Sequence, residues 1–242
     1  MPRPGARAEQ DIATFTEEMV AALGQELVCL VLHGSAAGED WVAGRSDVNT
    51  ALIVPRVTLA LLERLAPLVA RWRERGFALP VVMDHEYFRR ARDVFPMELD
   101  DISRQHRLLA GADLFADLTL ERTALRRECE REARGKLLRL RALFLETGRT
   151  PAVIEQLMVE SVKSFIVVLR HLIRLRQADV GHAYGPVVTA GERIVGPLPT
   201  IRKLLAHRGG DARATPAALR AEFGAYLAEV ERIVEAVDAL DA

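Results

Sequence analysis

The sequence is poor in aromatic side chains and has no excess of charge of either sign. Phe, Tyr and Trp make up 5% of the 242 residues, so a surface for stacking nucleic acid bases has little to draw on. Lys and Arg number 33 against 34 Asp and Glu, which gives a net charge of -1. We therefore expect no global attraction to nucleic acid or to an anionic membrane.

Cysteines and long apolar runs are also scarce. The two cysteines, Cys29 and Cys129, argue against a disulfide framework or a cysteine-rich zinc site. No apolar run approaches the roughly 20 residues of a membrane-spanning helix, and the first ten residues lack the apolar segment of a signal peptide. We expect a cytoplasmic protein with no membrane partner. Only three basic residues are lysines, and the richness in Arg, Ala and Leu is typical of a GC-rich bacterial genome.

Half of the residues are hydrophobic, which is enough for a sizeable core. The first half of the chain alternates between helical and strand patterns, whereas long helical patterns follow from about residue 118. This order predicts an α/β domain over residues 1–115 and an all-α helical bundle over residues 116–242. Residues 177–197 contain four glycines and two prolines and are predicted to be mainly loop, with at most a short helix around 187–194.

The stretch Leu27–Val54 contains the residues that indicate a function. It holds two short apolar runs, which we expect to be buried strands. The first run ends at Gly34 and Ser35, where glycine permits close backbone approach and serine offers a hydroxyl and an N–H to an anion. The second run is preceded by Asp47 and Asn49, which leave the same face of an extended backbone because they are two residues apart.

An apolar strand, Gly-Ser, roughly ten residues and an acidic pair entering a second strand form a recurrent motif. In this pattern the chain resembles the nucleotidyltransferase superfamily, which includes DNA polymerase beta and the aminoglycoside nucleotidyltransferases. Asn49 departs from the family, because it stands where a second carboxylate is usual. The resemblance spans about residues 8–111. It implies a mixed sheet with flanking helices, Mg²⁺ as cofactor, ATP or another NTP as substrate, and transfer of a nucleoside monophosphate to an acceptor.

The resemblance also implies site residues. A third carboxylate is expected from a later strand, and we assign it to Glu98 in a strand predicted over Phe95–Ile102, with Asp100 or Asp101 as alternatives. The expected catalytic and metal-binding set is Asp47, Asn49 and Glu98. The expected nucleotide-binding set is Gly34, Ser35, Arg45 and Ser46.

Asn49, which stands where a second carboxylate is expected, weakens the expected binding of Mg²⁺. Two Mg²⁺ ions roughly 3.5–4 Å apart usually clamp the attacking and leaving oxygens of such a transfer, and Mg²⁺ favours carboxylate ligands. Asn49 keeps a carbonyl oxygen but lacks the negative charge. The sequence therefore predicts one weakly held Mg²⁺ with its nucleotide rather than two firmly held ions.

Three functions remain open at this point. The chain could be an active nucleotidyltransferase with a small-molecule or macromolecular acceptor, or a degenerate member that acts by binding nucleotide or a partner. For either function, a homodimer is among the partners considered. The third is a HEPN-like ribonuclease, whose Arg-to-His spacing occurs at Arg176–His182 and Arg202–His207. The arginines of residues 118–147 are read either as a solvated face with ion pairs one helical turn apart or as a phosphate-binding stripe.

Overall fold

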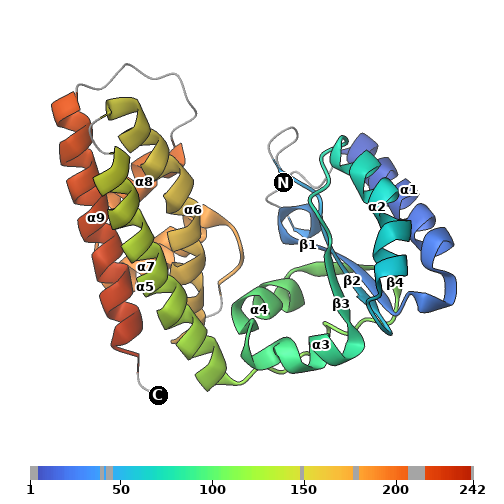
Figure 1. Ribbon diagram of the computed structural model, residues 1–242. Coiled ribbons are helices and arrows are strands. Elements are labelled where there is room, and N and C mark those ends of the chain that lie inside the picture. The colour runs from blue at the N-terminus through green and yellow to red at the C-terminus, as the bar shows by residue number, and fades with distance from the viewer. Residues whose placement is uncertain are drawn as a thin grey trace. The chain divides into compact units, whose positions relative to one another are not determined.

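The computed structural model describes residues 5–38, 41, 46–147, 150–176, 180–206 and 216–240. The chain divides into two compact units, Met1–Glu121 and Arg122–Ala242, whereas the sequence pattern predicts a boundary at residue 115. The first unit combines a sheet with helices and the second is built from helices (Figure 1). This is the predicted α/β domain followed by a helical part.

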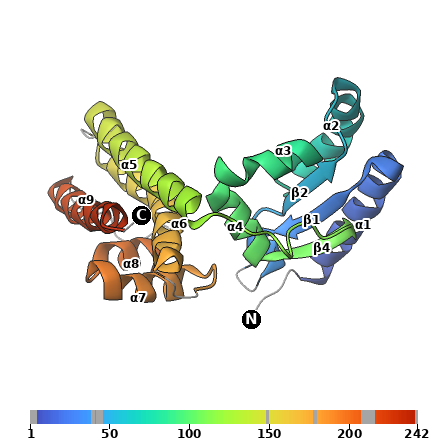
Figure 2. The ribbon, with the colours of Figure 1, turned by 90° about the horizontal axis from the view of Figure 1, so that it is seen from below.

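The first unit contains a four-stranded mixed sheet in the order β3-β2-β1-β4. Its strands are β1 (Cys29–His33), β2 (Asn49–Val54), β3 (Val81–Asp84) and β4 (His106–Gly111). Strand β1 is antiparallel to both β2 and β4, and β2 is parallel to β3. Figure 2 shows β4 alongside β1. The helices of this unit are α1 (Ala6–Leu23), α2 (Leu59–Arg73), α3 (His85–Arg90) and α4 (Pro96–Arg104).

Both faces of the sheet are buried, because alternate side chains of β1 and β2 enter two different hydrophobic clusters. Leu30 and Leu32 pack in one cluster with the apolar faces of α1 and α2. Val31 and its neighbours on the same face pack in the other cluster with residues of α3 and α4. Two helices of this unit begin at a capping side chain: Thr58 accepts from the Leu61 N–H at 3.2 Å, and Asp84 accepts from the Tyr87 N–H at 2.7 Å.

The strand predicted over Phe95–Ile102 is wrong, because this segment forms helix α4. Pro96 occupies the first turn of α4, where its missing N–H costs no hydrogen bond. Leu99 and Ile102 lie three residues apart and are both buried, which is helical spacing rather than strand alternation. The next strand begins only at His106. Glu98 therefore projects from a helix and not from a strand.

The second unit is assembled around one long helix. Its helices are α5 (Arg122–Thr147), α6 (Pro151–Leu175), α7 (Tyr184–Val195), α8 (Pro199–Ala206) and α9 (Pro216–Asp238). Helix α6 has many buried apolar side chains and packs against each of the other four helices. None of the described helices is long and apolar enough to cross a lipid bilayer.

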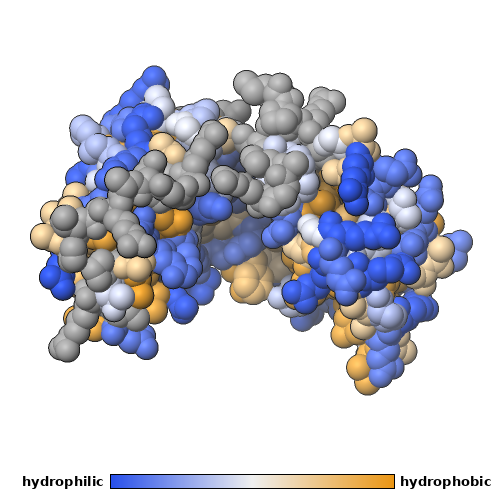
Figure 3. All heavy atoms as spheres, turned by 90° about the horizontal axis from the view of Figure 1, so that it is seen from above, coloured by the Kyte–Doolittle hydropathy of each residue, from blue (hydrophilic) through white to orange (hydrophobic). Residues whose placement is uncertain are grey.

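Four arginines of α5 form ion pairs: Arg126, Arg131, Arg134 and Arg141. Arg134 contacts Glu130 on its own helix at 3.3 Å and Asp238 at the end of α9 at 2.9 Å. Arg141 contacts Glu231 of α9 at 2.7 Å. These contacts favour the solvated, ion-paired face over a phosphate-binding stripe. On the face drawn in Figure 3, hydrophilic residues predominate and smaller hydrophobic patches interrupt them.

Candidate nucleotide site

Three polar side chains line up across one end of the sheet. His33, the last residue of β1, is paired with Asn49 of β2 on one side and with His106 of β4 on the other. Cross-strand partners project from the same face of a sheet, so these residues form a row, which we call the end row. Gly34 and Ser35 follow His33 directly. The structure thus brings the glycine-serine turn beside Asn49, as the motif predicts.

Gly34 is held in a conformation and a space that only glycine fits easily. Its φ of 69° lies in the left-handed region, and a β-carbon at this residue would lie 3.3 Å from Nδ2 of Asn49. The turn continues as a short 3₁₀ helix over Gly34–Ala37. Glycine is therefore required here by the turn and by the neighbouring strand together.

Gln105 fixes this turn from the other side. Its Nε2 donates a hydrogen bond of 2.8 Å to the carbonyl oxygen of Gly34. A β-carbon on Gly38 would lie 2.0 Å from the same nitrogen, so the Gln105 side chain lies directly against the loop. Sequence reasoning missed Gln105, and no local signal could have found it, because 71 residues separate it from Gly34.

Asp47 and Asn49 occupy different positions relative to strand β2. Asn49 is its first residue, whereas Asp47 precedes it and is exposed, with Val48 between them in an isolated bridge to Phe77. Nδ2 of Asn49 donates to the backbone carbonyl of Asp47 at 3.3 Å. The side-chain nitrogen of Asn49 is therefore occupied by the backbone carbonyl of Asp47. The carboxylate of Asp47 is accessible to solvent.

The described strands beside Asn49 do not supply a third carboxylate at this end of the sheet. Among the residues of β3 and β4, only Asp84 is acidic, and it is paired with Val54 at the opposite end of β2. Glu98 lines a groove that also includes Asp84. The expectation that Glu98 comes from a neighbouring strand is therefore wrong, and its role as a metal ligand remains a prediction.

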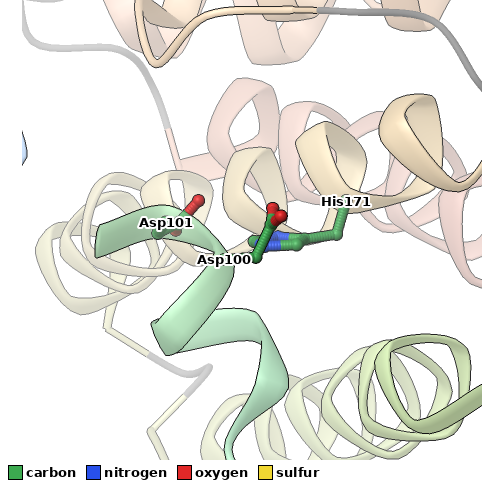
Figure 4. A group of neighbouring side chains, drawn as sticks. All are labelled: Asp100, Asp101 and His171. Atoms are coloured by element: carbon green, nitrogen blue, oxygen red, sulfur yellow. The ribbon is translucent and has the colours of Figure 1, made fainter. Parts of the chain in front are cut away.

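Asp101 is the carboxylate of α4 whose charge affects the pKa of His33 in the end row. Asp100 and Asp101 are consecutive on α4; Figure 4 also labels His171, which belongs to α6. Asp100 accepts a hydrogen bond from Nε of Arg104 at 2.7 Å. The negative charge of Asp101 raises the pKa of His33 and so partly offsets the effect of burial on that histidine.

Burial dominates the titration of His33. Its removal from water lowers its pKa from 6.5 to about 4, against the opposing effects of Asp101 and of a hydrogen bond with the Thr50 backbone. The charge of His106 lowers the pKa further. His33 is therefore neutral at neutral pH and presents a polar but uncharged group next to Asn49.

His106 is held between oxygen atoms on both sides of its ring. Nδ1 lies 3.0 Å from the carbonyl oxygens of Ile102 and Ser103, and Nε2 lies 3.0 Å from Oδ1 of Asp113. Carbonyl and carboxylate oxygens only accept, so both ring nitrogens of His106 face hydrogen-bond acceptors. Burial raises the pKa of Asp113, but hydrogen bonds from His106 and from two backbone N–H groups bring it below its usual value.

Of the remaining predicted residues, two lie outside the described part of the chain. Ser46 is half-buried just before Asp47. Arg45 and His207 lie outside the described residues. Arg202, the arginine of one ribonuclease-like pair, forms a two-point ion pair with Glu192 at 2.9 and 2.6 Å. That contact gives Arg202 a structural role in joining α7 to α8.

No family model matches the sequence, and no curated protein sequence is similar enough to be matched. Among solved structures, the chain is similar to the spectinomycin adenyltransferase AAD(9) from Enterococcus faecialis, whose crystal structure contains ATP and spectinomycin. The similarity covers 92% of this chain and 99% of that chain, with a TM-score of 0.56 and 11% sequence identity. The protein has a nucleotidyltransferase fold. The fold expected from the Gly34-Ser35 and Asp47 motif is thus confirmed. At this identity the nucleotidyltransferase fold is what the comparison establishes.

Proposed function

We propose that the protein binds a magnesium-bound nucleoside triphosphate at the end of the sheet and transfers its nucleoside monophosphate to an acceptor. The observation that carries this proposal is the contact between the Gly34 turn and Asn49, in a fold similar to that of an ATP-bound adenyltransferase. In the reaction, an acceptor hydroxyl attacks the α-phosphorus, loses its proton, and pyrophosphate leaves. A small-molecule acceptor is the first candidate, by analogy with the similar structure.

The glycine-serine turn is suited to phosphate oxygens. Ser35 offers a hydroxyl group and a backbone N–H, and Gly34 has no side chain to keep a ligand away from the backbone. A phosphate needs donors, and backbone carbonyl oxygens near it would repel it. The hydrogen bond from Gln105 engages the Gly34 carbonyl and so reduces that repulsion.

The donor set beside the turn fits one Mg²⁺ ion. Asp47 offers an exposed carboxylate, and Asn49, whose nitrogen faces the Asp47 carbonyl, keeps its amide oxygen as a ligand. Mg²⁺ commonly binds through one or two protein oxygens while water and nucleotide phosphates complete its shell. When bound, the ion would neutralise phosphate charge. A second firmly held ion would need another carboxylate, and Asp101 of α4, whose charge raises the pKa of His33, is a candidate.

A second candidate function is nucleotide binding without transfer. Asn49 in place of a carboxylate favours it, as does the lack of an acidic residue near Asn49 on the described strands β3 and β4. Neutral ligands lower the affinity for Mg²⁺ and remove the bridging carboxylate on which two-metal transfer depends. Binding and catalysis must therefore be measured separately.

The test of the proposed function is transfer of label from α-³²P-labelled ATP or GTP with Mg²⁺. The acceptors are a panel of hydroxyl-bearing compounds that includes spectinomycin, and pyrophosphate release is followed in parallel. Labelled product that disappears in Asp47→Ala supports transfer. Nucleotide binding with neither label transfer nor pyrophosphate release supports the second candidate, and absence of Mg²⁺-dependent nucleotide binding overturns both.

A further inference from the structure

A groove lies on the first unit along the edge strand β3. It has a volume of about 550 Å³ and is bordered by Val81–Asp84 of β3, by Tyr87 of α3 and by residues of α4. Figure 1 shows β3 next to α3. Asp84, at one end of the groove, pairs with Val54 at the end of β2 opposite Asn49, whereas Val81 pairs with Ala51, two residues from Asn49.

The groove leaves large apolar side chains in contact with water. Val81 is 44% exposed, Tyr87 50% and Phe95 39%. The rings of Tyr87 and Phe95 stack at an interplanar angle of 27°, with centroids 6.5 Å apart, so they present a continuous aromatic wall. Volumes of about 300–1,000 Å³ with mostly apolar walls are typical of small-molecule sites. The shape and lining therefore suit a small ligand with an apolar body.

The charges of the groove are all of one sign. Its ionisable acids are Asp84 and Glu98, and no Lys, Arg or His is among the described residues that line it. One oxygen of Asp84 accepts from the Tyr87 N–H, so the other remains available to a ligand. Glu98 is exposed in the first turn of α4. A ligand with a positive group gains from both carboxylates, whereas an anion is repelled.

We propose that this groove binds an organic cation in which an ammonium group is joined to an apolar or aromatic body. The body packs against Val81, Tyr87 and Phe95, and the ammonium group lies at Glu98 and Asp84. The faces of Tyr87 and Phe95 add to the attraction, because aromatic rings bind ammonium ions through their negative faces. Binding of a cation in this groove does not require that the proposed transfer occur.

The test uses three probes of the same shape and different charge: 4-phenylbutylammonium, 4-phenylbutanol and 4-phenylbutyrate. Binding to the full chain is followed by ¹³C-methyl NMR. We expect the ammonium probe to shift the methyl resonances of Val57, Val81 and Met83, which line the groove. We expect it to bind about three- to tenfold more tightly than the alcohol, and the carboxylate to bind most weakly.

Two variants and a matched control make the test specific. Glu98→Gln keeps the side-chain shape and should remove most of the preference for the ammonium probe over the alcohol. Val81→Lys puts a cation at the exposed edge of the groove and should abolish binding of the ammonium probe. Glu63→Gln removes an exposed acid from α2, outside the groove, and should change nothing.

Equal binding of all three probes overturns the proposal, as does an ammonium preference that survives Glu98→Gln. Methyl shifts that appear with protein concentration alone, together with a dimer in sedimentation, also overturn it, because a second copy then covers the groove. Failure of the nucleotide proposal has a different signature: Mg-ATP leaves the backbone amides of Gly34 and Ser35 unshifted while the groove still binds its probe.

Discussion

The side-chain nitrogen of Asn49 lies 3.3 Å from the place that a β-carbon on Gly34 would occupy. Asn49, the first residue of β2, and Gly34, the residue after β1, are therefore close neighbours, and Asn49 limits the space at the candidate phosphate turn. Four consequences of this arrangement can be measured, and a fifth measurement tests the site as a whole.

Gly34→Ala should lower the free energy of unfolding by about 1–3 kcal/mol, because it forces a β-carbon into a left-handed backbone conformation and against Asn49. Urea unfolding measures the loss. Gly76→Ala is the matched control: Gly76 also has a positive φ, of 88°, but a β-carbon there would meet nothing within 4 Å. Equal losses in both variants would mean that contact with Asn49 has no part in the effect.

Asn49→Asp should destabilise the nucleotide-free protein by about 1 kcal/mol, since a carboxylate cannot donate to the Asp47 carbonyl and is repelled by it. Mg-ATP should restore more stability to this variant than to the wild type, because a ligand of the folded state alone stabilises by mass action. Thermal melts with and without Mg-ATP test both parts. A response no larger than that of the wild type would mean that the site has lost more than one charge.

His33 should make stability depend on pH on the acid side of neutrality. Its pKa is about 4 in the folded chain and near 6.5 when exposed, so between these values the unfolded chain binds more protons. Stability due to neutral His33 is therefore present above pH 6.5 and is lost as the pH falls to 4, by at most about 3 kcal/mol. Urea unfolding at pH 7, 5.5 and 4.5 in EDTA should show a shallower loss for His33→Asn. Identical slopes would contradict the assignment.

Gln105→Ala should weaken Mg-ATP binding about fivefold, because the Gly34 carbonyl loses its donor and the turn loses the side chain packed against it. Calorimetric titration measures the change. Gln10→Ala, at an exposed position of α1, serves as the control for loss of a glutamine. Unchanged affinity in Gln105→Ala would show that the turn holds its shape without this hydrogen bond.

The elements that the sequence predicts well are those with short-range signals. The apolar runs of β1 and β2 and the Gly34 turn lie within 28 residues and carry their pattern locally. The predicted strand over Phe95–Ile102 fails because Met97 and Leu99 alternate with acids, a pattern that a short helix starting at Pro96 also produces. Strand β4 gives little signal, since most of its residues are half-buried or exposed and it begins with His106.

The prediction of mainly loop over residues 177–197 of the second unit is also wrong, because it relied on glycines. The glycine-rich stretch before Val195 reads mainly as loop, yet α7 forms there over Tyr184–Val195. A β-carbon on Gly191 would lie 2.4 Å from Leu169 of α6, so this glycine permits close packing of two helices and does not break one. The end row and the contact of Gln105 are likewise set by strand register and packing, which no local pattern encodes.

The most direct test of the account is calorimetric titration of ATP into the protein with Mg²⁺, compared between the wild type, Asp47→Ala and Glu63→Ala. Both substitutions remove an exposed carboxylate, but only Asp47 precedes Asn49 at the end of the sheet. The account predicts Mg²⁺-dependent binding in the wild type and in Glu63→Ala, with a loss of tenfold or more in Asp47→Ala, about 1.4 kcal/mol. Equal affinity in all three proteins would contradict a nucleotide site at Asp47.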